Sequence, residues 1–264
     1  MTDTDLAKDL SVMDREPEGD RPQMSEAGTI VGVFFEPGRT FEDLRRKPRF
    51  ILAAILIALF ISAYGFALNY KVGSEGMRRF MVEQIEKNPQ AAGMPTEDKN
   101  KMIDLQLTIQ SYVRYALPII IFIFLLLGGL IYFLGGKAFG GSGGFMHALS
   151  VWVYSSLPPT VIGMIGSLIV MAFKPVEQID IATSQRGLLQ ANPSIFIDGK
   201  ANPILATLIG TIDLFMIWGW VLAAIGLRVT NKISSGSAWA IVIIVAIIGV
   251  LFRIISAIFS GNPS

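Results

Sequence analysis

Asp213 and Arg253 are the two residues of this chain whose type and position could do chemistry, because each interrupts an apolar stretch long enough to cross a membrane. Charges inside membrane spans are rare, usually face other helices, and often mark a transport path or a structural ion pair. Counted at about 1.5 Å per helical residue, the two charges lie at similar depths below one membrane surface. We therefore predict that they pair inside the bundle. The alternative is that Arg253 reaches the outer headgroups, while Asp213 is protonated or bonds a hydroxyl such as Ser155.

Other signatures of catalysis or metal binding are weak. The chain has no cysteine, which excludes thiolate metal sites and a cysteine nucleophile, and its single histidine, His147, excludes a two-histidine metal site. The segment GGKAFGGSGG at 135–144 is dense in glycine, but it joins two apolar stretches and matches no nucleotide-binding fingerprint. We expect it to be a tight turn. We also expect no catalytic residue, no metal site, no cofactor and no nucleic-acid partner.

Membrane spans are the elements that must position the two charges. The chain is 52% hydrophobic and only 16% charged, whereas soluble domains carry about 25% charged residues. Apolar stretches of about 20 residues match the thickness of the hydrocarbon core. The sequence therefore predicts an all-α fold, a bundle of five transmembrane helices. The predicted spans cover residues 50–68, 115–134, 148–173, 204–227 and 238–259.

The stretch before the first span combines aromatic, turn-forming and basic residues. A short apolar piece stops at Pro37, and Thr40 is a candidate helix N-cap with Asp43 three residues later. We predict an interfacial amphipathic helix whose rings lie at the acyl boundary or against the bundle, with its basic residues at headgroup depth. The N-terminal motif defined in this way comprises Phe35, Pro37, Thr40, Phe41, Arg45, Arg46, Lys47 and Pro48.

Two further segments lie outside the predicted spans. Residues 1–27 are acidic and contain no aromatic residue, so we expect a disordered tail. Residues 71–114 separate the first two spans. Ser74 can cap one helix there, and Thr96 can cap a second that continues without a break into the next span. We expect an extramembrane helical hairpin packed over the bundle, with a cap that binds a ligand as the alternative.

Charge distribution predicts the orientation of the chain. The basic cluster before the first span is the densest positive cluster at any predicted membrane end. Cytoplasmic flanks of membrane spans are enriched in lysine and arginine. We therefore expect a multi-pass protein of the bacterial inner membrane, with its N-terminus in the cytoplasm.

Several short motifs then resemble those of one family. They are FEPGRTF at 35–41, YSSLP at 154–158, IDLF at 212–215 and GLR at 226–228. In this order and spacing, over residues 28–260, the chain resembles bacterial Yip1-domain proteins. The resemblance implies a five-span integral membrane domain with a cytoplasmic N-terminus. Eukaryotic relatives act in vesicle traffic and bind Rab GTPases, so binding of a small GTPase enters only by distant analogy.

Together these features favour a membrane organiser or adaptor without catalytic activity. Its expected partners are the lipid bilayer and either other membrane proteins or further copies of the chain. The alternative is a small transporter or permease component that uses Asp213 and Arg253, and the least favoured class is a membrane-bound enzyme. An internal repeat is typical of transporters, and the two halves of this sequence show none.

Overall fold

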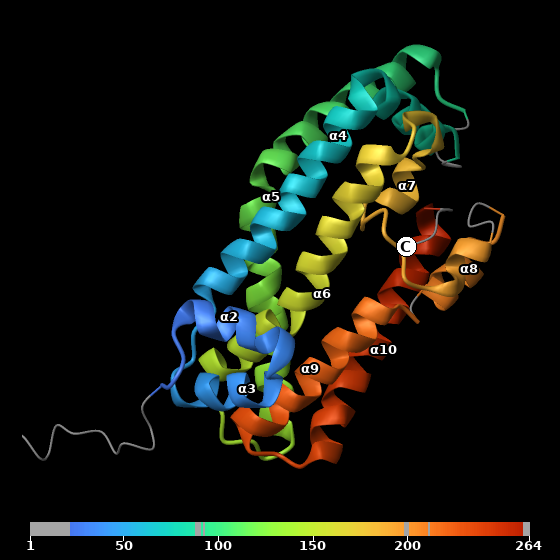
Figure 1. The fold of residues 1–264 in the computed structure, drawn as a ribbon. Coiled ribbons are helices and arrows are strands. Elements are labelled where there is room, and N and C mark those ends of the chain that lie inside the picture. Colours follow the sequence, from blue (N-terminus) through green and yellow to red (C-terminus); the bar gives the residue numbers. More distant parts are fainter. Residues whose placement is uncertain (1–21, 88–90, 92, 198–200, 211, 261–264) are drawn as a thin grey trace, which may run out of the picture.

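The computed structural model describes residues 22–87, 91, 93–197, 201–210 and 212–260. Throughout these ranges the regular elements are helices (Figure 1). Residues 1–21 of the expected acidic tail lie outside the described part of the chain. The main helices are α2 (Glu26–Phe35), α3 (Pro37–Arg46), α4 (Ile51–Lys87), α5 (Thr96–Ala138), α6 (Phe145–Phe173), α7 (Ile181–Ser184), α8 (Pro203–Gly210), α9 (Leu214–Asn231) and α10 (Ser235–Ser260).

In the part of the chain that the structure describes, five helices, α4, α5, α6, α9 and α10, are long and apolar enough to cross a membrane, which confirms the expected all-α bundle. In Figure 1, α4 and α5 lie side by side, and α9 and α10 form the opposite part of the molecule. The α2–α3 hairpin lies at the end where the α5–α6 and α9–α10 turns are found. The end of α4 and the start of α5 lie at the other end.

The extent predicted for the fourth span was wrong. Residues 204–227 do not form one helix, because α8 ends at Gly210 and α9 begins at Leu214. Asp213 is the N-cap of α9, and its carboxylate accepts a hydrogen bond from the N–H of Phe215. A short polar side chain that bonds nearby backbone favours a helix start over a helix interior. The spanning helix is therefore α9, 18 residues long, about 27 Å at helical rise.

The segment before the first span folds as two helices joined at Pro37. The apolar piece belongs to α2, which begins at Glu26 and is capped by the Ser25 side chain. Pro37 occupies the first position of α3, where its missing N–H costs nothing. The expected N-cap role of Thr40 was wrong, because Thr40 lies inside α3, fully buried. Its hydroxyl lies where a Cβ on Gly32 would meet it at 2.6 Å, so α2 and α3 approach closely there.

The α2–α3 hairpin packs into the core of the bundle. Phe41 and Leu44 are completely buried and belong to the main hydrophobic cluster. The ring of Phe41 lies close to α9, where a Cβ added at Gly226 would meet it at 2.9 Å. Phe34 makes an edge-to-face contact with Trp218 of α9, with ring centroids 6.1 Å apart. Of the expected aromatic anchors, Phe41 is thus held by protein, whereas Phe35 remains 80% exposed.

The α5–α6 crossing depends on small residues. A Cβ added at Gly128 would overlap the indole of Trp152, and one at Gly129 would lie 2.9 Å from the backbone Cα of Leu149. Small residues at such positions let two membrane helices approach closely. Beside them, Tyr132 and Trp152 stack edge-to-face with centroids 4.8 Å apart.

The helical hairpin expected between the first two spans is formed by the ends of α4 and α5. Gly73 has φ +72°, a conformation that favours glycine, and it breaks α4 just before the predicted helix start at Ser74. The continuous helix from Thr96 into the second span is also as expected. Arg78 of α4 forms an ion pair with Asp104 of α5. A small hydrophobic core, separate from the main one, is formed here by Met81, Ile85, Ala91 and Ile103.

The glycine-dense turn packs closely against the end of α9. The N–H of Ser142 donates to the carbonyl of Asn231 at 3.0 Å. A Cβ at Gly143 would lie 2.0 Å from the Asn231 side-chain oxygen, so only glycine fits there. The glycines of the turn therefore allow close packing around a buried asparagine.

Candidate functional site

A large cavity lies between α6 on one side and α9 and α10 on the other. Its volume is about 1090 Å³, at the upper end of the sizes typical of ligand-binding sites, which are about 300–1,000 Å³. The α6 wall carries Ser155, Thr160 and Ser167, and the α10 wall includes Val242 and Arg253. The connection between α6 and α9, with its helices α7 and α8, contributes further lining residues, as do Phe80 and Gln84 of α4 and Tyr132 of α5.

Asp213 lines this cavity but its carboxylate is committed to backbone and amide donors. One oxygen accepts from the N–H of Phe215 at 2.8 Å. The other accepts from the N–H of Ala191 at 3.1 Å and from the side-chain amide of Asn192 at 2.9 Å. Asp213 thus starts α9 and also fixes the preceding loop against it.

Arg253 lines the same cavity from α10. One of its guanidinium nitrogens lies 3.4 Å from the sulfur of Met216, a weak acceptor. Within the described residues, no ion pair joins Arg253 to Asp213. The structure therefore brings the two predicted residues to one cavity without the direct contact expected for them.

We predict that the cap, and not an ion pair, dominates the contribution of Asp213 to stability. Asp213→Ala should lower the free energy of unfolding by about 1–2 kcal/mol, because the N-cap acceptor is lost. Asp213→Asn should restore part of that loss, because its side-chain oxygen can still cap α9, whereas its NH2 group would face the donors of Ala191 and Asn192. Melting temperatures of the purified variants in mild detergent test this. Equal damage from alanine and asparagine would contradict a dominant role of the cap.

Sequence reasoning missed Arg186, a second cation that lines the cavity. It follows α7 in the connection between α6 and α8, and a long polar loop gave no signal for its position. Partial burial, reinforced by the guanidinium of Arg253, lowers the pKa of Arg186 to about 10. The side chain therefore stays charged at neutral pH.

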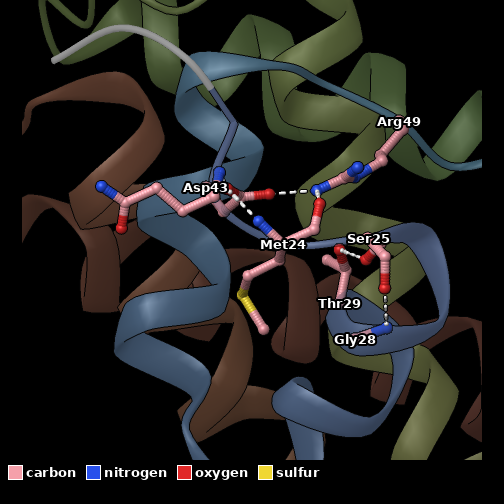
Figure 2. A network of polar contacts seen from close by, with 7 residues as sticks. Met24, Ser25, Gly28, Thr29, Asp43 and Arg49 are labelled. Atoms are coloured by element: carbon pink, nitrogen blue, oxygen red, sulfur yellow. Dashed lines mark hydrogen bonds and ion pairs between the residues drawn. The ribbon is translucent and has the colours of Figure 1, made fainter. Parts of the chain in front are cut away.

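The N-terminal motif is organised by a buried ion pair that sequence reasoning also missed (Figure 2). Asp43 of α3 is 2% exposed and pairs with Arg49, which follows α3. Arg49 also donates to the carbonyl of Met24 at 2.9 Å, and Asp43 accepts from the N–H groups of Gln23 and Met24. The sequence contained one indication of this pair, namely that Asp43 lies close to the four basic residues Arg45, Arg46, Lys47 and Arg49. This network ties the start of α2 to the entrance of α4.

The basic residues of the motif differ in their surroundings. The side chain of Arg45 is 29% exposed and lies 3.8 Å from Glu42. The carbonyl of Arg45 lies 3.1 Å from Nε2 of His147 on α6. Because Nδ1 of His147 accepts from the N–H of Gly144, Nε2 carries the proton and donates to Arg45. The histidine therefore joins α3 to the start of α6.

A largely exposed apolar stripe runs along α5 and continues N-terminal to the predicted span. Successive members are three or four residues apart. In this N-terminal part, Leu105 is 59% exposed, Ile109 51% and Tyr112 73%. Exposed patches of large apolar side chains commonly mark an interaction surface. The α5 stripe, as we call it, consists of Leu105, Ile109, Tyr112, Ala116, Ile119, Ile123, Leu126 and Leu130.

Comparisons with known proteins agree with this architecture. The family model described as Yip1 domain matches residues 31–257. The Bacillus subtilis (strain 168) protein named "Membrane protein YknW" is 29% identical over 238 residues, which cover 90% of this chain and 93% of that protein. No solved structure matches the chain significantly.

Proposed function

Because the chain belongs to the Yip1 domain family, we propose that it is a non-catalytic membrane organiser that assembles with a second copy of itself through the α5 stripe. The observation that carries the proposal is the exposure of Leu105 and Ile109. Leu105 precedes the predicted start of the span at Tyr115 by ten residues, about 15 Å at helical rise. Lipid does not account for an apolar side chain at that height, whereas a protein partner does.

The spacing of the stripe supports a second copy as the partner. Its members alternate at four and three residues from Leu105 to Leu130, which is the seam of a left-handed coiled coil. All copies of a membrane protein share one orientation. A two-fold axis along the membrane normal therefore sets α5 beside α5 in parallel, with equal residues at equal heights.

Disulfide formation between copies tests this arrangement, because the natural chain contains no cysteine. Leu105→Cys and Ile109→Cys, oxidised in native membranes, should each give a covalent dimer of the chain. Asn100→Cys is the matched control, because Asn100 is exposed and lies about 140° around the helix from Leu105. It should give no dimer.

A second pair of variants separates assembly from accidental collision. Leu105→Asp with Ile109→Asp should abolish the dimer in crosslinking with a lysine-directed reagent, whereas Asn100→Asp should leave it unchanged. A dimer that survives the double substitution, or an adduct only with a different protein, would overturn self-assembly through α5.

We further propose that the protein lies in a bacterial inner membrane with α2 and α3 on the cytoplasmic side. The basic cluster next to α3 supports this, since cytoplasmic flanks favour lysine and arginine. In the cysteine-free chain, Ser142→Cys, at an exposed position of the α5–α6 turn, should be protected from an impermeant maleimide in intact cells, whereas Gln185→Cys should be labelled. Labelling of Ser142→Cys alone would reverse the orientation, and labelling of both would contradict the topology.

A further inference from the structure

The cavity between α6 and α10 is lined by more positively charged side chains than negatively charged ones. Three charged side chains line it among the described residues: Arg186, Arg253 and Asp213. The Asp213 carboxylate already accepts hydrogen bonds from Ala191, Asn192 and Phe215. Neither arginine forms an ion pair with another described residue. The two guanidinium groups therefore line the cavity without an ion-pair partner among the described residues.

The two arginines also repel each other. Arg253 is half-buried and Arg186 is exposed, and the positive charge of Arg253, after burial, contributes to lowering the pKa of Arg186. Holding two cations at one cavity costs free energy, and an anion bound to both would offset that cost. Arginine presents a planar set of donors that matches the oxygens of phosphate and carboxylate in pairs.

Polarity changes along the length of the cavity. On α10 the lining residues Ser256 and Arg253 lie toward the end of the helix, and Val245 and Val242 lie deeper. Val242 and Arg253 are 11 residues apart, about 16 Å along the helix. On α6, Trp152 lies at the deep end. One end of the cavity thus suits a charged group and the other suits an apolar chain.

We propose that this cavity binds an anionic amphiphile, with its phosphate or carboxylate group between Arg186 and Arg253 and its apolar part along α10. Gln190 and Asn192 line the charged end and can supply further donors. The apolar end distinguishes such a molecule from a free anion, which would use only the charged end. This site lies apart from the α5 stripe and does not depend on self-assembly.

Binding of short-chain lipids to the full-length protein in detergent tests the proposal. The probes are dihexanoyl phosphatidic acid, dihexanoyl phosphatidylcholine and inorganic phosphate. Trp152 and Trp220 line the cavity, so their fluorescence reports its occupation. Phosphatidic acid should bind more tightly than phosphatidylcholine. Arg186→Gln and Arg253→Gln should each weaken its apparent Kd about tenfold or more, because one guanidinium partner is lost.

Matched controls separate charge at the site from charge in general. Arg79→Gln removes an exposed arginine of the α4 extension and should leave binding unchanged. Arg253→Lys should retain part of the affinity. If Arg253→Gln does not fold, as judged by gel filtration, Arg186→Gln carries the test because it lies in a connecting loop.

Each outcome decides the proposal. Tight binding of phosphatidic acid that depends on both arginines supports it. The same response to inorganic phosphate, without added affinity from the acyl chains, assigns the site to a free anion and overturns the amphiphile. Equal binding of both lipids, or no effect of either glutamine substitution, overturns the site altogether.

Discussion

Replacing Asp43 by alanine is expected to lower the free energy of unfolding by about 3–5 kcal/mol, because Arg49 would be left as an uncompensated, nearly buried charge. The side chains of Asp43 and Arg49 are only 2% and 13% exposed. The substitution also removes the acceptor for the N–H groups of Gln23 and Met24. Unfolding of the purified protein in mild detergent, followed by circular dichroism, measures the effect.

A double substitution tests whether the loss comes from the stranded charge. Asp43→Ala with Arg49→Leu should recover much of the stability, because apolar replacements of a buried ion pair are often nearly neutral. Glu42→Ala is the neighbouring control. The side chain of Glu42 is 52% exposed, so its loss should cost at most about 1 kcal/mol. Purely additive losses in the double variant would contradict the buried-charge explanation.

Gly129→Val is expected to destabilise the bundle by about 3 kcal/mol or more, which is the upper range for overpacking a close contact. The Cβ of the new side chain would lie 2.9 Å from the Cα of Leu149. Backbone cannot rotate aside as a side chain can, so α5 and α6 would have to separate. Thermal unfolding in detergent measures the loss.

The matched control for this prediction is a membrane-helix glycine with open space around it. A Cβ at Gly249 of α10 meets nothing within 4 Å. Gly249→Val should therefore remain close to the natural chain in melting temperature. Similar losses for both glycines would indicate that helix flexibility, and not the α5–α6 contact, is responsible.

The sequence by itself determined the class of the fold. Apolar stretches of about 20 residues have few alternatives to crossing the bilayer as helices, because lipid satisfies no backbone hydrogen bonds. The unbroken pattern from Thr96 onward likewise predicted one long helix, and α5 has this form. Gly73 breaks α4 next to the helix start expected at Ser74. These features follow from local composition and local backbone preference.

Features that join distant parts of the chain were decided by the tertiary structure. Hydropathy predicted a single span from Ile204 to Leu227. In the structure, the Asp213 carboxylate accepts a hydrogen bond from the N–H of Ala191, in the preceding loop, and Asp213 starts a new helix. Thr40 was expected as a cap because of its neighbours, yet α2 covers it.

The two arginines of the cavity show most clearly that contacts between distant parts of the chain cannot be predicted from local sequence. Arg186 and Arg253 are 67 residues apart in the sequence, and only the packing of the α6–α8 connection against α10 brings both to one cavity. Asp43 and Arg49 are close in sequence, but how much their ion pair contributes to stability depends on how deeply the two side chains are buried. Burial and long-range contact set the energy of a charge, and a linear pattern of residue types contains neither of them.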